Sequence, residues 1–540
     1  MSLIVPKEIL LSTSNEMLLK AREKAGFYRN NDEVIISSDY LDKSGLTELL
    51  ELAGKHKESK LARSIEVILL ALDGVFAKPI PNFNAFKEVL TSYLKHNAID
   101  GWIYVECRDG QMLPELVTDI FYKDGGRSDS PPSVTIKTLS YTMSDGGGVK
   151  MGVRGNSHTF YPAHVARKRI DSILQERGIF KETATLKAQY QAAIERHQEL
   201  AVGAYSRQFR ATGPAIREIG HYGSEVPRFS SSRVIWDLTD DACGSVPISE
   251  ESVIFDGAMD QDGHSIVPKH PLTVVFELEC QSFFWINTCH LTPHVYDKSL
   301  GEKLILPATH RDLLDVLTTD IEALTGDIIE GKSAGNIILC KGIPGVGKTL
   351  TAEVYAELIE RPLYKVHSGT LGTTAKDIEK SLKTVFQRAD RWGCVLLLDE
   401  ADVFVARRGK DIEQNAIVAE FLRTLEYFAG LLFLTTNRPD DIDEAIISRC
   451  AAVISYNPPT TEDARKIWLV LAQQFNALLD ERLLDGLLVL FPAIAPRDIK
   501  MLLRLALRMS ASRNLPLSLD LFRQCAMFRA IEMSPSGAAL

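Results

Sequence analysis

The sequence predicts an α/β protein whose main feature is a five-stranded parallel sheet with helices on both faces, at residues 307–458. Three observations support this fold class. Five short runs in this region are largely apolar, as strands buried on both faces are. Amphipathic segments of helical period separate the runs, as crossover helices separate parallel strands. Residues 459–540 show helical period only, which predicts an all-helical C-terminal lid.

Each element of the parallel sheet can be placed from this alternation. The predicted strands are residues 336–340, 363–366, 394–398, 431–435 and 452–455. The predicted crossover helices are residues 349–359, 375–391, 413–428 and 441–448, and the lid helices are 462–475, 481–490, 497–512 and 517–533.

The residues before this sheet are mixed in character and predict an α+β N-terminal region. Helical spacing dominates first, short β-rich runs between turn clusters follow, and two apolar runs near residues 273–286 predict a hairpin. We therefore expect five units. They are a helical unit (1–100), an α+β unit with a basic helical segment (101–265), a strand-rich module (266–306), the α/β domain (307–458) and the helical lid (459–540).

Composition and charge exclude several classes of protein. Hydrophobic residues make up 45% and charged residues 24% of the chain, so cores can form and general disorder is excluded. The net charge of −10 argues against a surface that coats nucleic acid throughout. The eight cysteines form no C-x-x-C pair, and no apolar run approaches the ~18 residues of a membrane helix. We expect a soluble, cytoplasmic protein without membrane contact.

One motif predicts nucleotide binding. The string Gly-Ile-Pro-Gly-Val-Gly-Lys-Thr at 342–349 matches G-x-x-x-x-G-K-[ST] and lies between a predicted strand and a predicted helix. Such a loop surrounds phosphate with backbone N–H groups, while Lys348 reaches the β/γ-phosphates and the Thr349 hydroxyl ligates Mg²⁺. The alternative is a chance glycine-rich turn. The expected cofactors are ATP and Mg²⁺.

Polar residues follow two later predicted strands. Asp399 and Glu400 end residues 394–400, and Asn437 ends residues 431–437. Ligands of open parallel sheets bind at the carboxyl ends of the strands. We expect Asp399 to hold Mg²⁺, Glu400 to orient the attacking water, and Asn437 to contact the γ-phosphate or the water. The alternative is that the two acids only begin a solvated loop.

Arg449 follows the segment 443–448 and is a candidate for catalysis across a subunit boundary. An arginine here can reach the nucleotide of a neighbouring subunit, as trans-acting arginines do in phosphoryl transfer. The alternative is a surface arginine in a local ion pair.

In order and spacing, these motifs resemble those of an AAA+ ATPase, over about residues 304–533. The strings are G-I-P-G-V-G-K-T (Walker A), L-L-L-D-E (Walker B), T-T-N with Asn437 as sensor 1, and I-S-R with Arg449 as the arginine finger. Ala495-Pro-Arg-Asp-Ile-Lys resembles the sensor 2 helix, which makes Arg497 a candidate γ-phosphate contact. The nucleotide-binding residues that we expect are Gly342, Ile343, Pro344, Gly345, Val346, Gly347, Lys348, Thr349, Leu350, Asp399 and Arg497.

Other strings are similar to those of a poorly characterised AAA subgroup of fungi and bacteria, with a strand-rich module before the core. Arg361-Pro-Leu-Tyr and Leu432-Phe-Leu-Thr-Thr-Asn-Arg are among them. One departure concerns the pore loop that grips unfolded chains in threading members. The corresponding segment, 368–375, has no aromatic residue, and Leu371 either contacts a substrate or packs.

Two further candidates are weak. Cys289, His290 and His294 have metal-compatible side chains, but no second pair completes a zinc site. Residues 151–210 contain ten Lys/Arg and five Asp/Glu, a local net charge of +5, which suits a nucleic acid or an acidic partner but equally a solvated helix face.

The resemblance implies an Mg²⁺-dependent ATPase that forms rings, as a homo-hexamer. It would couple hydrolysis to remodelling or disassembly of a macromolecular partner, a protein in preference to a nucleoprotein, recruited by the N-terminal half. The second hypothesis is an ATP-controlled oligomeric switch or scaffold whose N-terminal region binds nucleic acid or a protein effector.

Overall fold

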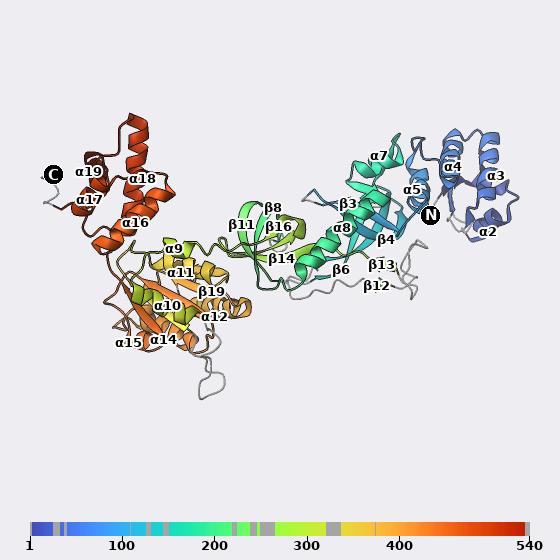
Figure 1. Ribbon diagram of the computed structural model, residues 1–540. Coiled ribbons are helices and arrows are strands. Elements are labelled where there is room, and N and C mark those ends of the chain that lie inside the picture. Colours follow the sequence, from blue (N-terminus) through green and yellow to red (C-terminus); the bar gives the residue numbers. More distant parts are fainter. Residues whose placement is uncertain are drawn as a thin grey trace.

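The computed structural model describes residues 3–24, 33–36, 40–107, 110–125, 131–143, 151–218, 224–237, 246–248, 265–319, 336–372 and 374–534. The molecule is elongated, with the N-terminal helices at one end and the C-terminal helical lid at the other (Figure 1). Two antiparallel sheets and one parallel sheet, each of five strands, lie between these ends.

The N-terminal unit packs helices on the antiparallel sheet β6-β5-β4-β3-β7. Its buried apolar side chains form one core from Leu3 to Ile179, so the helices before residue 100 and the strands after it share a core, and the boundary expected at residue 100 does not separate two cores. The elements are β1 (Leu3–Pro6), α1 (Lys7–Leu11), α2 (Glu16–Lys24), β2 (Glu33–Ile36), α3 (Lys43–Lys55), α4 (Ser59–Leu72), η2 (Phe83–Ala85), α5 (Phe86–Lys95), β3 (Trp102–Glu106), β4 (Met112–Lys123), β5 (Ser133–Met143), β6 (Met151–Phe160), α6 (Pro162–Val165), α7 (Ile170–Gln175) and β7 (Ile179–Lys181).

A buried carboxylate fixes the entry of the chain into this sheet. Glu182, directly after β7, accepts hydrogen bonds from the backbone N–H groups of four successive residues, 99–102, at 2.5–3.3 Å. Four successive amides that point to one place form an anion-binding concavity, and here a side chain of the same chain occupies it. Glu182 therefore ties β7 to the loop before β3.

The basic segment 151–210 is only partly helical. It contains strands β6 and β7, the short helices α6 and α7, the long helix α8 (Ala184–Ala201) and the start of β8 (Gln208–Pro214). Thr183 caps α8 by accepting from the N–H of Leu186 at 3.2 Å. The local composition predicts charge but does not fix the type of element, because β6 and β7 are stabilised by pairing with β5 and β3.

The second antiparallel sheet, which we call the middle sheet, has the order β15-β14-β11-β8-β16. The hairpin predicted near residues 273–286 is confirmed as β14 and β15. Two strands of the same sheet, β8 and β11, come from before residue 265, so the expected boundary at 265/266 passes through this sheet. The further elements are β9 (Arg217–Glu218), β10 (Ser224–Glu225), β11 (Arg228–Trp236), β12 (Val246–Ile248), β13 (Ser265–Val267), β14 (Leu272–Glu277), β15 (Ser282–Asn287), η5 (Thr288–His290) and β16 (Leu291–Pro293).

Hydrogen bonds join the N-terminal sheet to the segment that enters the middle sheet. The N–H of Tyr141 on β5 donates to the carbonyl of Pro268 at 2.8 Å, and the N–H of His270 donates to the carbonyl of Tyr141 at 3.0 Å. The next strand of the chain, β14, starts at Leu272. The two sheets are therefore connected next to β14, which is buried along its whole length.

The predicted parallel sheet is confirmed, with the order β18-β19-β20-β17-β21 and every pair parallel. Strands β19 and β20 are buried along their whole length, which explains their apolar sequences. The elements are α9 (Leu300–Lys303), α10 (Ala308–Thr319), β17 (Asn336–Gly342), α11 (Lys348–Leu358), β18 (Leu363–His367), η6 (Ser368–Thr370), α12 (Ala375–Trp392), β19 (Val395–Asp399), α13 (Asp402–Val405), α14 (Ile412–Leu425), β20 (Leu431–Thr436), α15 (Glu444–Ile447) and β21 (Ala452–Tyr456).

Aromatic packing holds the middle sheet against the parallel sheet. Phe276 of β14 contacts Trp392 of α12 and Tyr364 of β18, with ring centroids 4.8 and 5.5 Å apart. Asp237, directly after β11, accepts hydrogen bonds from the indole N–H of Trp392 and from the guanidinium of Arg391, each at 2.7 Å. The two sheets share one hydrophobic core, which opposes independent movement.

The C-terminal lid contains four helices around a separate core that includes the fully buried Trp468. They are α16 (Thr461–Gln474), α17 (Glu481–Leu490), α18 (Pro496–Arg513) and α19 (Leu519–Phe528), in agreement with the predicted segments. Among the helices that the structure describes, none has the length and apolar character needed to cross a membrane.

We predict that Glu182→Ala opens the loop before β3. The substitution leaves up to four N–H groups without their acceptor, and an unsatisfied buried group costs about 1–3 kcal/mol. Amide hydrogen exchange of residues 99–102 in the full chain should become about tenfold faster or more. Glu176→Ala is the control, because the ion pair of Glu176 with Lys168 lies at the surface, and it should leave this exchange unchanged. Equal rates in wild type and Glu182→Ala would contradict the role of Glu182.

Candidate functional site

The glycine-rich loop lies between β17 and α11 at the carboxyl edge of the parallel sheet, as the sequence predicts. A Cβ on Gly342 would lie 2.2 Å from the backbone carbonyl oxygen of Tyr456, so no side chain fits where β17 passes β21. Gly347 has φ +103° at the start of α11, a conformation that favours glycine. The loop therefore requires glycine at 342 for lack of space and favours glycine at 347 for its backbone conformation.

Lys348 lies at the centre of the site. Its ammonium donates to the carbonyls of Gly342 and Ile343, each at 2.8 Å, and to Oδ1 of Asn437 at 2.9 Å. The structure thus brings the predicted phosphate lysine and the predicted sensor amide into direct contact. Burial lowers the pKa of Lys348, against the opposing charge of Asp402.

Thr349 and Asp399 form an oxygen pair suited to a hard cation. The Thr349 hydroxyl donates to Oδ1 of Asp399 at 2.8 Å, and the Thr435 hydroxyl donates to the same oxygen at 2.7 Å. Burial opposes ionisation of Asp399, but these hydrogen bonds and the charge of Lys365 outweigh it and hold the pKa of the carboxyl below its usual value. A hydroxyl next to an ionised carboxylate is the donor chemistry that Mg²⁺ prefers.

Glu400 is exposed at the end of β19 and has a left-handed backbone, with φ +56°. This conformation costs an ordinary residue about 1 kcal/mol. The N–H of Glu400 donates to the Thr435 hydroxyl at 2.9 Å, and the N–H of Ala401 donates to the Thr435 carbonyl at 2.8 Å. Hydrogen bonds to β20 therefore stabilise a turn that presents the Glu400 carboxylate to solvent at the sheet edge.

Sequence reasoning missed Asp402, which orients the sensor strand. Its Oδ1 accepts from the N–H of Asn437 at 2.9 Å and from the Thr436 hydroxyl. The acid lies three residues after Asp399, at the start of α13. The signal was present in the string Asp-Glu-Ala-Asp, but only the pairing of β19 with β20 shows which amide the last acid contacts.

Arg449 is not part of this cluster. Its guanidinium forms an ion pair with Glu426, next to the C-terminal end of α14, and donates to the carbonyl of Ala445 at 3.2 Å. The local ion pair that the sequence left open as the alternative is therefore present within this chain. An arginine that acts in trans must exchange this partner for a group on another subunit.

Arg497 connects the lid to the glycine-rich loop. Its N–H donates to the carbonyl of Gly345 at 3.1 Å, and a Cβ on Gly345 would lie 3.0 Å from Cβ of Arg497. Gly345 has φ +87°, which favours glycine at this contact. The first turn of α18 therefore touches the loop that is predicted to bind phosphate.

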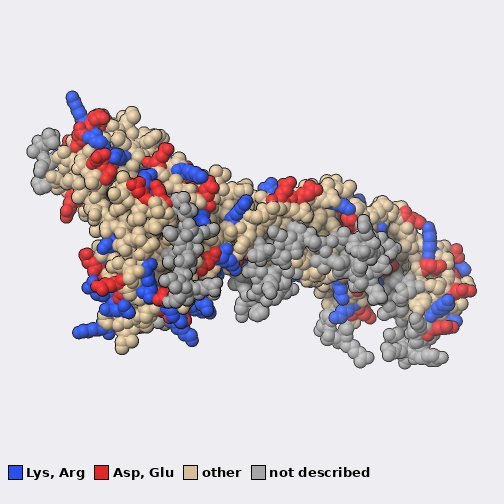
Figure 2. Space-filling view, turned by 60° about the horizontal axis from the view of Figure 1, so that its bottom comes forward, with Lys and Arg blue, Asp and Glu red and all other residues tan. Residues whose placement is uncertain are grey.

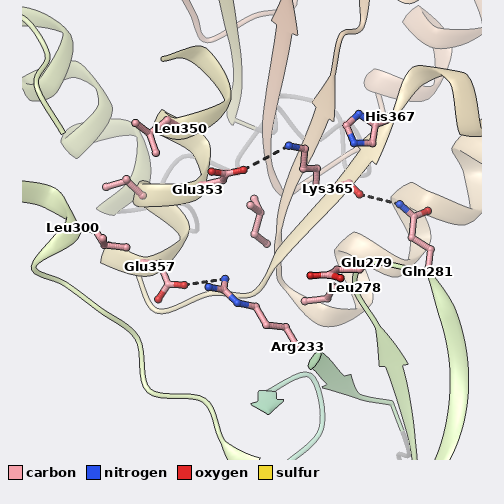
Figure 3. Close-up of a pocket in the computed structure, with 12 residues that line it drawn as sticks. Arg233, Leu278, Glu279, Gln281, Leu300, Leu350, Glu353, Glu357, Lys365 and His367 are labelled. Atoms are coloured by element: carbon pink, nitrogen blue, oxygen red, sulfur yellow. Dashed lines mark hydrogen bonds and ion pairs between the residues drawn. The ribbon is translucent and has the colours of Figure 1, made fainter. Parts of the chain in front are cut away.

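The remaining loop residues differ in position. Val346 is buried, whereas Ile343 and Leu350 are about half exposed. Leu350 lies on the rim of a cavity of about 620 Å³ between α11, β18 and the β14–β15 turn (Figure 3). Lys365, also unrecognised in the sequence, lies in this cavity, with its ammonium 3.1 Å from Oδ2 of Asp399 and 3.5 Å from Oε1 of Glu353.

The other candidates have structural roles. Within the described ranges, no group of three metal-ligating side chains gathers, and His294 instead contacts Glu357 at 3.4 Å. Burial lowers the pKa of His294. Leu371, in the segment without an aromatic residue, is 2% exposed and packs in the core shared with β14.

Comparisons with known proteins find similarity in the part of the chain that contains this site. Residues 338–457 match the family model described as "ATPase family associated with various cellular activities (AAA)". The chain is 28% identical over 240 residues to Fidgetin-like protein 1 of Drosophila melanogaster, covering 40% of this chain and 46% of that protein. It is 30% identical over 175 residues to the uncharacterized AAA family ATPase y4kL of Sinorhizobium fredii, covering 29% of this chain and 52% of that protein. The chain thus spans about half the length of these curated relatives.

A solved structure also matches this part of the chain. The FIGL-1 AAA domain in complex with ADP is 20% identical to this chain, with a TM-score of 0.34, and the match covers 42% of this chain and 82% of that one. The family model spans β17 to β21 and so includes Lys348, Thr349, Asp399, Glu400, Asn437 and Arg449. Residues 338–457, which contain the site, are therefore similar to the AAA family of ATPases.

Proposed function

We propose that the chain binds ATP with Mg²⁺ and hydrolyses it at the carboxyl edge of the parallel sheet. One observation carries the proposal: Lys348, Asn437, Thr349 and Asp399 join three strand ends and the glycine-rich loop through hydrogen bonds of 2.8–2.9 Å. Loop N–H groups and the Lys348 ammonium would bind the phosphates. Thr349 and Asp399 would hold Mg²⁺, which when bound neutralises charge on the phosphate oxygens.

The remaining residues have distinct proposed roles. Glu400, turned outward by its backbone, accepts a proton from the attacking water and orients it. Asn437, fixed by Asp402, donates a hydrogen bond to the γ-phosphate without adding charge. Arg497 reaches the nucleotide from the lid, and Arg449 stabilises transition-state charge in a neighbouring subunit of a homo-hexameric ring.

We further propose that hydrolysis remodels a protein partner bound by the N-terminal half. Helix α11 offers a route for the coupling: it begins at Lys348 and Thr349, and near its other end Glu357 pairs with Arg233 of the middle sheet at 3.0 Å. The N–H of Asp297 donates to the same carboxylate at 3.0 Å. A shift of the phosphate loop would therefore reach the middle sheet through one rigid helix.

A switch or scaffold that binds nucleic acid through residues 151–210 is the weaker candidate. Many basic side chains there are engaged within the chain: Lys168 pairs with Glu176 at 2.6 Å and Lys187 with Asp100 at 2.7 Å. Lys181 donates to the carbonyl of Tyr93 at 2.6 Å. Acidic and basic groups are interspersed on the face shown in Figure 2. These contacts favour a structural role for the local positive charge.

Two substitutions test the chemistry. Lys348→Ala should remove phosphate contacts and lower both ATP binding and turnover, the latter by roughly 10²-fold or more. Glu400→Gln should preserve binding and lower turnover by about 10²–10⁴-fold, because the amide cannot accept the proton. Lys341→Ala and Glu413→Gln are matched controls outside the hydrogen-bonded cluster. Phosphate release and equilibrium ATP binding are the measurements, and wild-type turnover in both test variants would overturn the assignment.

Mixing two inactive variants tests the role of Arg449. Arg449→Ala should lose about 10³-fold in turnover if the guanidinium acts in phosphoryl transfer. In a ring that mixes Arg449→Ala with Glu400→Gln subunits, some interfaces combine an intact Glu400 with an intact Arg449. Turnover of the mixture should exceed that of either variant alone. A mixture no more active than its components, under conditions where native mass spectrometry shows mixed assemblies, would exclude action in trans.

Partner dependence separates the two proposals. If the chain remodels a protein, Glu400→Gln should retain that protein with ATP, and the captured protein should raise wild-type turnover severalfold and leave the complex as ATP is hydrolysed. Lys348→Ala is the matched control that should not retain it. Assembly by ATP binding alone, with turnover unchanged by the partner, would instead support the switch.

A further inference from the structure

Lys365 occupies a position that the proposed reaction has not yet used. It lies on β18, one strand away from Asp399, and extends from the wall of the cavity between α11, β18 and the β14–β15 turn (Figure 3). Its ammonium lies 3.1 Å from Oδ2 of Asp399. The hydroxyls of Thr349 and Thr435 take the other oxygen, Oδ1. Each oxygen of the carboxylate thus has its own partner.

A second carboxylate shares the same ammonium. Oε1 of Glu353, on α11, lies 3.5 Å from Nζ of Lys365 (Figure 3). The Lys365 side chain is 31% exposed, whereas that of Asp399 is 10% exposed. The Asp399 carboxylate is therefore largely shielded from water. A charge interacts more strongly with a neighbouring charge where less water lies between them, so the Lys365 ammonium should act strongly on Asp399.

The backbone of Lys365 is held from the middle sheet. The side-chain amide of Gln281, in the turn between β14 and β15, donates to the Lys365 carbonyl at 2.9 Å. Phe276 of β14 packs on Tyr364, the preceding residue of β18. Lys365 therefore combines a fixed backbone with a side chain that contacts the carboxylate proposed to hold Mg²⁺.

We propose that Lys365 is a positioning residue that sets the Mg²⁺ affinity of the nucleotide site. This inference rests on the proposed ATPase function. The ammonium orients Asp399 through Oδ2 and opposes a second cation at the same carboxylate, because like charges within a few ångströms repel. Glu353 competes with Asp399 for the same ammonium and so favours the metal. The two residues should therefore affect Mg²⁺ binding in opposite directions.

The test measures binding and needs no turnover. The affinity of the full chain for a fluorescent ATP analogue is titrated against free Mg²⁺, and the Mg²⁺ concentration at half-maximal effect is recorded. We expect Lys365→Met to lower this concentration about tenfold, and Glu353→Gln to raise it severalfold. Lys365→Arg keeps the positive charge, so its half-maximal Mg²⁺ concentration should remain close to that of wild type. If substitution at this position merely disturbed the fold, Lys365→Arg would also change this concentration.

Lys298→Met is the matched control. Lys298 forms an ion pair of similar length, 2.9 Å, with Glu360 beyond the C-terminal end of α11, and its loss should leave the Mg²⁺ dependence unchanged. An unchanged or higher half-maximal concentration in Lys365→Met, or a shift of both test variants in the same direction, would overturn the inference. Wild-type protein whose nucleotide binding ignores Mg²⁺ would instead overturn the proposed function itself.

Discussion

The organisation of this protein depends on the burial of the parallel sheet on both faces. Strands such as β19 and β20 have no exposed face, so polar side chains can appear only where a strand ends. Asp399, Glu400 and Asn437 lie at such ends, and the parallel arrangement brings them to one edge. The glycine-rich loop leaves β17 at the same edge, which places Lys348 within hydrogen-bond distance of Asn437. The site is therefore a consequence of the sheet and not of a separate set of loops.

The second level of organisation is the attachment of the middle sheet to this core. Helix α11 and strand β18 each have one end at the site and a contact with the middle sheet, through Glu357 and through the carbonyl of Lys365. The packing of Phe276 on Trp392 adds an apolar contact that water cannot weaken by competing for hydrogen bonds. The packed middle sheet therefore resists a change in the position of the glycine-rich loop or of Asp399.

The sequence predicted the parallel sheet, the lid and the location of Lys348, Thr349, Asp399 and Asn437 at one edge of the sheet, because each rests on local period or on a motif between two elements. The middle sheet was only partly predicted. Strands β8 and β11 lie in a segment of uneven composition and are stabilised by pairing with β14 and β16, which no local pattern reveals. Lys365 and Asp402 were missed for a related reason: their partners are set by the register of neighbouring strands. Glu426, the partner of Arg449, depends likewise on how α14 and α15 pack.

The route of the chain between the N-terminal and middle sheets has a mechanical consequence. The chain enters the middle sheet after α8, leaves it after Trp236, and touches β5 through Pro268 and His270 before it re-enters at Leu272. A unit that is joined by one chain connection can rotate about that connection. A unit that is joined by two connections and by hydrogen bonds can rotate only if all of them move together. Rotation of one antiparallel sheet against the other therefore has to move both chain connections and the hydrogen bonds of Tyr141 together.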